Sequence, residues 1–259
     1  MKSLTCQLLD LSIADVEVVH NLQLEFEPGS FWAVLGSNGA GKTTLLNCLA
    51  GLKPADRGRV MLGDEDVHRG SRRKLAIQMG MLQQHSSYVF DSTVFETILT
   101  GRHPHLKRWE NESPVDFRIA RHALEQVDLA GFENRCVTSL SGGEARRLAF
   151  ATLLVQQVNV LLLDEPSNHL DLRHQLQVME MIHEQSEKEG KTAIAALHDI
   201  NLAMSFCSNV LMLFGGGEWA AGPVGEMMTE ERLERIYGCP IARFESAQGP
   251  RFYPQARGR

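Results

Sequence analysis

The sequence has little that would mark a basic surface, a disulfide framework or a membrane segment. Its 259 residues carry a formal net charge of −6, which argues against nucleic-acid binding as the main activity and leaves no polybasic membrane anchor. The five cysteines are scattered and contain no C-x-x-C pair, as is typical of reduced thiols in a cytosolic protein. The first residues lack the apolar run of a signal peptide, and the most apolar later run is interrupted by Gln156, Gln157 and Asn159. We therefore expect a soluble chain that reaches a membrane only through a partner.

Internal repeats, low-complexity blocks and extended heptads are also missing. The length suffices for one large α/β domain or for a core with a subdomain. Short apolar alternations over residues 4–28 predict an antiparallel β layer, and residues 59–65 predict a strand that ends in a turn. Further strands are expected over 77–82, 158–163, 192–197 and 210–214, with helices over about 172–188, after residue 198 and near 226–237. The end of the chain, rich in proline and glycine, is expected to be loosely ordered.

The stretch that organises this pattern is a glycine loop between an apolar strand, Phe31–Leu35, and a helix that begins near Thr44. It has the phosphate-loop pattern of two spaced glycines followed by lysine and a hydroxyl residue. Its members are Gly36, Ser37, Asn38, Gly39, Ala40, Gly41, Lys42, Thr43 and Thr44. Backbone N–H groups and the positive end of the helix dipole would hold a polyphosphate, Lys42 would reach the β- and γ-phosphates, and Thr43 would bind Mg²⁺. A phosphate loop alone does not choose among kinases, GTPases, helicases and transport ATPases.

Two acidic residues follow the apolar strand that ends at Leu163. Asp164 is expected to hold the Mg²⁺ hydration shell, and Glu165 to polarise the water that attacks the γ-phosphate. An acidic strand end without catalytic use is the plain alternative. Its combination with the phosphate loop favours the catalytic interpretation.

Between about residues 93 and 156 the apolar residues fall at helical spacing. We interpret 93–156 as an inserted helical subdomain, and 1–92 with 157–259 as the nucleotide-binding core, its β layer and the C-terminal tail. The polar stretch Arg102-His103-Pro104-His105 has too few ligands for a metal site and is expected to be a solvated loop.

Ser141, Gly142 and Gly143 form a second glycine element, followed by Glu144 and a helical pattern. Small residues that open a helix are suited to phosphate binding. An ordinary N-cap with an acidic first turn explains the same letters equally well.

The ordered motifs resemble those of ATP-binding subunits of ABC transporters, over nearly the whole chain. Residues 36–43 match the Walker A loop and 140–144 the LSGG signature, while 160–165 match Walker B with its catalytic glutamate. Gln84 matches the Q-loop glutamine, residues 168–171 the D-loop and His198 the switch histidine. The resemblance implies the P-loop NTPase (RecA-like) fold: a mainly parallel sheet, an N-terminal antiparallel β layer and an inserted helical subdomain.

The resemblance also implies roles that spacing does not supply. Two subunits of such proteins pair head to tail, and each ATP lies between one Walker A loop and the partner's signature. Ser141, Gly142 and Gly143 would then contact the γ-phosphate bound by the partner, and Asp171 would belong to the composite site. Gln84 would sense Mg²⁺ and the attacking water, and His198 would contact the γ-phosphate. Glu165, His198, Gln84 and Lys42 are thus the expected catalytic set, with Thr43, Gln84 and Asp164 at the metal.

One departure from the family concerns adenine. The family usually stacks this base on an aromatic side chain of the β layer, but Ile13, Ala14 and Asp15 provide none. Phe31 and Trp32 are expected to be core residues instead. Base selectivity is therefore expected to be weaker than usual.

We expect an ATPase subunit at the cytoplasmic face of the membrane, bound to a permease and served by a substrate-binding protein. Three segments resemble importers of iron-siderophore, haem or cobalamin: residues 84–87, residues 101–105 after Thr93–Glu96, and the tail with Gly222-Pro223 and Tyr237-Gly238. The alternatives are a soluble ABC-type ATPase of DNA repair or translation, and a nucleotide-binding regulator that does not hydrolyse ATP.

Overall fold

The computed structural model describes residues 1–84, 88, 91–247 and 249–255. Its central sheet has six strands in the spatial order β10–β9–β3–β8–β7–β6, and every neighbouring pair is parallel except β10 with β9. The strands are β3 (Phe31–Gly36), β6 (Met79–Leu82), β7 (Val160–Asp164), β8 (Thr192–Ala196), β9 (Asn209–Gly215) and β10 (Glu218–Pro223). This arrangement confirms the expected α/β class with a mainly parallel sheet.

Both faces of the central sheet are buried, as its near-continuous apolar runs require. Successive side chains of β3 point to opposite faces. Phe31, Ala33 and Leu35 join one hydrophobic core, while Trp32 and Val34 join the other. Phe31 and Trp32 are therefore packing residues, as expected.

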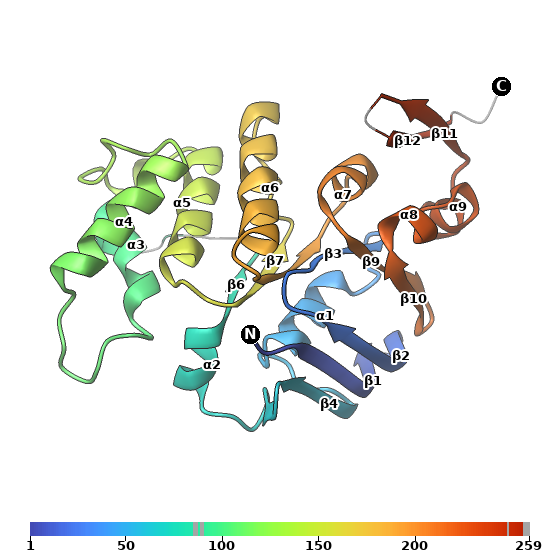
Figure 1. Cartoon of the computed structure of the whole chain (residues 1–259), viewed down its shortest axis with the longest axis horizontal. Helices are drawn as coiled ribbons and strands as arrows, with labels where there is room; N and C mark the ends of the chain where they lie inside the picture. Colours follow the sequence, from blue (N-terminus) through green and yellow to red (C-terminus); the bar gives the residue numbers. More distant parts are fainter. Residues whose placement is uncertain (85–87, 89–90, 248, 256–259) are drawn as a thin grey trace.

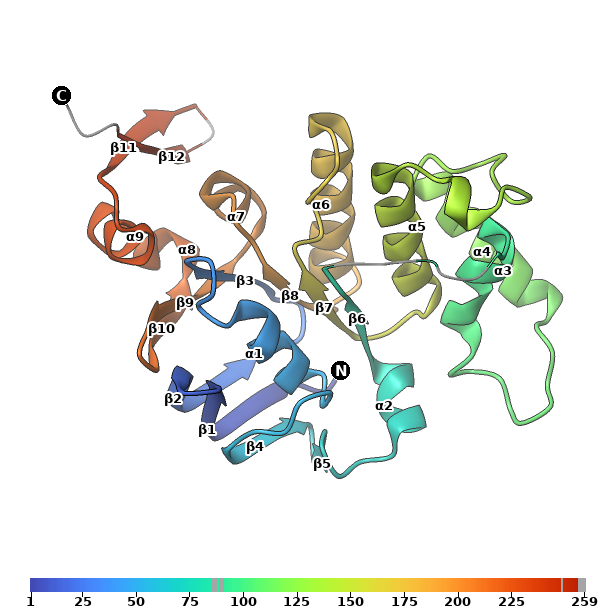
Figure 2. The ribbon, with the colours of Figure 1, turned by 180° about the vertical axis from the view of Figure 1, so that it is seen from behind.

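An antiparallel layer of four strands, in the order β2–β1–β4–β5, covers one face of the molecule. It consists of β1 (Leu4–Ile13), β2 (Val16–Phe26), β4 (Arg57–Leu62) and β5 (Glu65–Asp66). Helix α1 (Lys42–Leu49) lies between this layer and the central sheet (Figures 1 and 2). Its buried Leu45, Leu46, Cys48 and Leu49 share one core with residues of both sheets, which fixes the start of α1 at the end of β3.

Helices cover the opposite face of the central sheet. They are α6 (Leu172–Glu187) and α7 (Ile200–Phe206), with α8 (Val224–Met227) and α9 (Glu230–Tyr237) toward the β9–β10 edge (Figure 1). The buried Val178, Met179 and Ile182 of α6 pack in the same core as Phe31 and Leu35 of β3. These contacts bring the ends of β7 and β8 to the start of α6 and α7.

A group of helices stands to one side of the sheets (Figures 1 and 2). It contains α3 (Val94–Leu99), α4 (Pro114–Gln126) and α5 (Gly142–Val155), with the short 3₁₀ turns η1 (Thr100–Arg102) and η2 (Val137–Ser139). Helices α3, α4 and α5 pack on one another, and α5 also contacts β6. Arg102 corrects the expectation of a solvated loop: its guanidinium is buried and donates to Asp116 at 2.7 Å. His103 next to it is exposed.

Two segments differ from the sequence-based expectation. Residues 77 and 78, expected to begin a strand, end helix α2 (Arg72–Gln78), and β6 begins only at Met79. The C-terminal region, expected to be loose, forms a hairpin of β11 (Ile241–Ser246) and β12 (Gly249–Pro254). The hairpin is ordered because Phe252 is buried in the main core and its backbone pairs with the side chain of Asn201 in α7.

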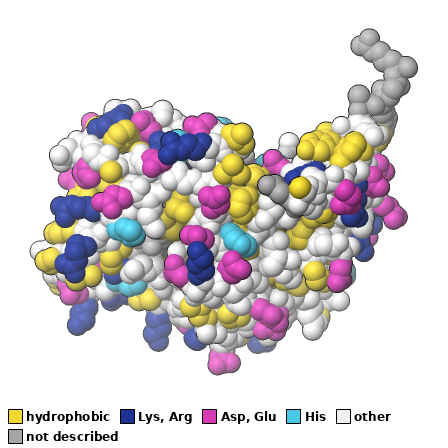
Figure 3. All heavy atoms as spheres, turned by 45° about the horizontal axis from the view of Figure 1, so that its top comes forward, with side chains coloured by type: hydrophobic (Ala, Val, Ile, Leu, Met, Phe, Trp, Pro, Cys, Tyr) yellow, Lys and Arg dark blue, Asp and Glu magenta, His cyan; other side chains and the backbone are white. Residues whose placement is uncertain are grey.

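Lysine, arginine and acidic side chains are interspersed over the face that Figure 3 shows. Among the described residues, no helix combines the length and the apolar character that crossing a bilayer requires.

Candidate functional site

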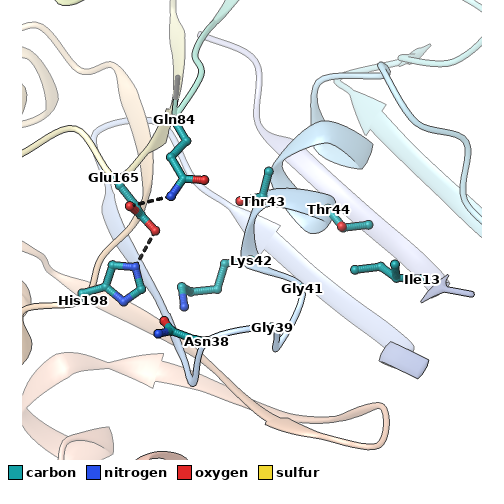
Figure 4. A pocket seen from close by; sticks show the side chains of 10 residues that line it. All are labelled: Ile13, Asn38, Gly39, Gly41, Lys42, Thr43, Thr44, Gln84, Glu165 and His198. Carbon is teal, nitrogen blue, oxygen red and sulfur yellow. Dashed lines mark hydrogen bonds and ion pairs between the residues drawn. The ribbon is translucent and has the colours of Figure 1, made fainter. Parts of the chain in front are cut away.

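A pocket of about 440 Å³ opens where α1 begins, beside the carboxyl ends of β3, β7 and β8 (Figure 4). This is the edge of a parallel sheet at which ligands of α/β proteins bind. Ten residues from five segments line it: Ile13, Asn38, Gly39, Gly41, Lys42, Thr43, Thr44, Gln84, Glu165 and His198. The chain fold thus brings together the predicted phosphate loop, the Q-loop glutamine, the acidic residue after β7 and the histidine after β8.

The phosphate loop owes its shape to glycine. Gly39 and Gly41 have φ values of 80° and 92°, in the region that residues with a Cβ atom rarely adopt. A Cβ atom at Gly41 would also lie 2.5 Å from the Val18 methyl groups. The β layer therefore presses directly on the loop and holds it against the start of α1.

Lys42 lies under the loop and is nearly buried, with 7% of its surface exposed. Its Nζ donates to the carbonyls of Gly36 at 2.8 Å and Ser37 at 3.1 Å. Burial lowers the pKa of the Lys42 ammonium, and the carboxylates of Glu165 and Asp164 oppose that effect. In the described chain, the first turn of α1 has no acidic residue and no side-chain cap, so its backbone N–H groups and Lys42 together favour an anion.

Glu165 is the most constrained side chain of the pocket. Gln84 Nε2 donates to its Oε2 at 2.9 Å, and His198 Nε2 donates to Oε1 (Figure 4). Asn168 Nδ2 donates to the same Oε2. The backbone of Glu165 is left-handed, with φ 53°, a conformation that costs a non-glycine residue about 1 kcal/mol or more. The surrounding hydrogen bonds hold this strained residue with its carboxylate toward the pocket.

Asp164 ends β7 one residue earlier and is 1% exposed. Neither carboxylate oxygen has a hydrogen-bond partner among the described residues. Burial is the main influence on the carboxyl and raises the pKa of Asp164, while the Thr43 hydroxyl acts in the opposite direction. A buried carboxylate with both oxygens unsatisfied calls for a cation or a donor from a ligand.

These residues fit Mg²⁺ bound together with phosphates. The described residues contain no group of three or more His, Cys, Asp or Glu side chains that would hold a metal by themselves. Mg²⁺ is commonly held by one or two protein oxygens plus substrate phosphates and water. Asp164 with the Thr43 hydroxyl provides that smaller donor set.

Ser141, Gly142, Gly143 and Asp171 do not line the pocket of their own chain. Ser141 caps α5, and Asp171 caps α6 by accepting from His174 N at 3.0 Å. Ser141, Gly142 and Asp171 are exposed. The single chain therefore separates the two glycine elements.

Arg146 is a site residue that the motifs of the sequence do not predict, and it lies in α5 with 4% of its surface exposed. Its guanidinium donates to the backbone carbonyls of Gln84 and Glu165. A signal exists in the sequence: Arg146 shares the i, i+4, i+7 spacing of the buried Phe150 and Leu153, so it occupies the inward face of the helix.

Residues 85–87, which suggested the importer group, lie outside the described residues. Thr93–Glu96 forms the capping box of α3.

The sequence of this chain is similar to those of known ATP-binding proteins. The family model described as "ABC transporter" matches residues 19–168, more than half of the chain. The chain is 37% identical to the petrobactin import ATP-binding protein of Bacillus anthracis, over 92% of this chain and 87% of the relative. It is 34% identical to the ferric enterobactin transport ATP-binding protein of Escherichia coli K12, over 96% and 93%. It is 35% identical to the hemin import ATP-binding protein of Rhizobium meliloti, over 89% of each chain.

Solved structures with the same fold include a metal-chelate type ABC transporter in an inward-facing conformation. That chain has a TM-score of 0.86 and 24% identity, with 99% of both chains covered. An ATP-binding cassette in a dimeric post-hydrolysis state, bound to ADP and Pi, has a TM-score of 0.75 and 23% identity, covering 85% of this chain and 98% of the other. At these identities the likeness establishes the fold.

Proposed function

This chain belongs to the ABC transporter family of ATP-binding subunits, and on that premise we propose that it hydrolyses ATP with Glu165 as general base to drive import through a separate permease. Members of the family are transporter ATPases, and the chain is an ATP-binding and ATP-hydrolysing subunit of this kind. One observation supports Glu165 as the base. At the pocket wall its carboxylate accepts hydrogen bonds from Gln84, Asn168 and His198.

The proposed chemistry is an in-line attack of water on the γ-phosphorus. Glu165 takes the proton from the water as the new P–O bond forms, and the bond from the γ-phosphorus to the ADP oxygen breaks. Lys42 and the N–H groups of the loop bind the β- and γ-phosphates, and His198 keeps Glu165 in place while contacting the γ-phosphate. Thr43 and Asp164 would hold Mg²⁺ within reach of Gln84, and the bound ion would neutralise charge on the phosphates.

We assign the contact with adenine to Ile13. Its neighbours Ala14 and Asp15 are not aromatic, so they offer no ring for stacking. Ile13 ends β1, is 39% exposed and lines the pocket next to the phosphate loop. An aliphatic side chain covers the face of the base by van der Waals contact but lacks the ring stacking of an aromatic residue. This supports the expectation of weak discrimination between bases.

A second copy of the chain completes the site in this proposal. Cassettes of the family form dimers, and a two-fold dimer lets one surface carry both halves of a composite site. The exposure of Ser141 and Gly142 at the start of α5, away from their own pocket, supports a role toward the nucleotide of the partner. Asp171 belongs to the same proposed interface.

The permease contact is proposed at a groove of about 180 Å³ beside β6, the strand that leads to Gln84. Leu52, Leu75, Met79 and Met81 supply its apolar lining, and Leu52 is 59% exposed. Such a groove suits a short amphipathic helix from a membrane partner. The helices within 93–156, of which α5 contacts β6, would pass the motion on. The division into 1–92 with 157–259 and 93–156 is part of this proposal.

The relatives named for petrobactin import, ferric enterobactin transport and hemin import support a cargo of the iron-siderophore, haem or cobalamin class. We accordingly propose that the subunit sits at the cytoplasmic face of the membrane, bound to its permease, and that a substrate-binding protein delivers the cargo. Purification of the membrane protein that accompanies the chain tests this assignment. A purified complex without any membrane protein would instead support the soluble repair or translation ATPase.

Glu165→Gln is the direct test of the base. We expect the variant to bind ATP with unchanged affinity, to lose at least 1,000-fold of the hydrolysis rate, and to accumulate as an ATP-bound dimer, because the amide cannot accept the proton. Binding is measured by titration calorimetry, turnover by phosphate release and dimerisation by light scattering. Glu187→Gln, at an exposed position of α6, is the matched control. Hydrolysis by Glu165→Gln at the wild-type rate would remove Glu165 from the role of base.

A further inference from the structure

The guanidinium of Arg146 joins two segments of the site inside the protein. Nη1 donates to the carbonyls of Gln83 and Gln84, the latter at 3.1 Å. Nη2 donates to the carbonyls of Asp164 at 2.5 Å and Glu165 at 2.6 Å. One planar group, carried on α5, thus binds the backbone on both sides of the Gln84–Glu165 hydrogen bond.

Burying a guanidinium at this position costs free energy, because the charge loses its contact with water. Arg146 is nearly buried, has no carboxylate within ion-pair distance among the described residues, and leaves its Nε without a partner. A buried charge is tolerated where its donors are used and opposite charge lies near. Burial lowers the pKa of the Arg146 guanidinium, and the negative charges of Asp164 and Glu165 are the strongest influences that raise it again.

We propose that Arg146 is a positioning residue for hydrolysis, which fixes Gln84 and Glu165 relative to each other and transmits movement of α5 to both. The proposal rests on the proposed function, in which Glu165 is the base and Ser141 contacts the partner's nucleotide. Arg146 lies on the same helix as Ser141, little more than one turn further along. Closure of the dimer on Ser141 would therefore shift the carbonyls that orient the hydrolytic residues of the same chain.

The neighbouring Arg147 offers a matched control. It too is an arginine of α5, half-buried, and its Nη1 donates to the backbone carbonyls of Val127 at 2.6 Å and Asp128 at 2.9 Å. Those carbonyls belong to the end of α4 and the turn after it, inside the helical group. Arg147→Gln removes a similar clamp without touching the segments that carry Gln84 and Glu165.

The experiment compares Arg146→Gln, Arg146→Lys and Arg147→Gln in the full-length subunit, at protein concentrations that saturate dimerisation. Steady-state phosphate release gives kcat and KM, calorimetry gives the ATP affinity, and a thermal melt gives Tm. We expect Arg146→Gln to lower kcat at least tenfold with KM and ATP affinity within threefold of wild type. Arg146→Lys keeps the charge, but its one ammonium cannot reach all four carbonyls, so it should recover at least a third of the lost activity on a logarithmic scale and stay below the wild-type kcat. Arg147→Gln should keep kcat within twofold even where its Tm falls.

Transmission is tested by combining Ser141→Ala with Arg146→Lys. If α5 carries the signal through Arg146, the double variant loses less kcat than the product of the two single losses, because both changes interrupt one coupling. Losses that multiply would overturn the transmission step.

Wild-type kcat in Arg146→Gln, or equal losses of kcat and ATP affinity that follow Tm, would overturn the positioning role. If Arg146→Gln does not fold, Arg146→Lys decides alone: a lowered kcat at unchanged KM supports the role, and a wild-type kcat contradicts it. Glu165→Gln separates the two levels of inference. Continued hydrolysis by that variant refutes the proposed function, whereas its inactivity together with a fully active Arg146→Gln refutes only the role of Arg146.

Discussion

Helices α1 and α5 both begin at a glycine loop, but their first turns are satisfied in different ways. The N-cap of α1 is Gly41, which has a left-handed backbone and no side chain to cap the helix. The N-cap of α5 is Ser141, which accepts from Glu144 N while the Glu144 carboxylate accepts from Ser141 N at 2.7 Å. Arg135 pairs with that carboxylate at 3.3 Å. The first helix start therefore leaves its N–H groups without a side-chain acceptor, whereas the second has one within its own first turn.

The difference indicates how each start would meet a phosphate. At α1 most of the loop lines the pocket, namely Asn38, Gly39 and Gly41 to Thr44, and Lys42 Nζ lies beneath it against the Gly36 carbonyl. At α5 the capping box uses the N–H groups of Ser141 and Glu144, so those of Gly142 and Gly143 are left to point outward along the helix axis. We infer that α1 forms the main nucleotide site and that α5 adds a few donors to a site built by another chain.

Among these variants, Lys42→Ala should have the largest effect on ATP binding and hydrolysis. It removes the cation that lies below the loop, so we expect ATP affinity to fall at least tenfold and hydrolysis at least 100-fold. Binding of a non-hydrolysable ATP analogue and phosphate release measure the two losses. Lys188→Ala, at the exposed end of α6, should leave both unchanged. Wild-type binding by Lys42→Ala would mean that the α1 start is not the main phosphate site.

Gly41→Ala and Gly142→Ala make a matched pair with the next largest effect. A methyl group at Gly41 collides with Val18 in a left-handed backbone, whereas one at Gly142 meets nothing within 4 Å. We expect Gly41→Ala to lower both Tm and ATP affinity. Gly142→Ala should leave both within error for the isolated subunit yet reduce hydrolysis about tenfold, since the methyl group would meet the partner's nucleotide. Unchanged hydrolysis in Gly142→Ala would break the idea of a shared site.

The parts of the molecule that the sequence predicted are those with local signals. The order strand, glycine loop and helix is written in consecutive residues, so β3, the loop and α1 were placed correctly. Strand β7 is an uninterrupted apolar run because both of its faces are buried. The fold and the membership in the family follow from these motifs and their order.

The parts that it missed depend on distant contacts. Helix α2 buries only Leu75, so it has no apolar periodicity to reveal it. The C-terminal hairpin is held by Phe252 in the core and by Asn201, 51 residues away along the chain. Arg146 binds backbone carbonyls, which every residue type carries, so its partners leave no trace in the sequence. The joint hold of Gln84, Asn168 and His198 on Glu165 likewise exists only once β6, β7 and β8 are side by side.

Glu144→Gln should have the smallest effect and tests whether charge stabilises the start of α5. Hydrogen bonds from the Ser141 backbone and hydroxyl, with Arg135 nearby, hold the pKa of Glu144 below its ordinary value of 4.5. Glutamine keeps an acceptor for the Ser141 N–H, so the change removes the charge and little else. We expect a loss of about 0.5 kcal/mol of stability at pH 7 from the helix dipole and the Arg135 pair. Urea unfolding at several pH values measures it.

The pH dependence of that difference has a defined sign. A carboxyl whose folded-state pKa is lowered stabilises the fold fully above its unfolded pKa, and the contribution disappears as the pH falls through the folded value. The gap between wild type and Glu144→Gln should therefore be constant from pH 7 to about 5.5 and then narrow as the pH drops below 4.5. A gap that stays constant down to pH 3 would show that the acceptor oxygen, and not the charge, holds the first turn of α5. The contrast with α1, which has no acidic residue at its start, would then rest on geometry alone.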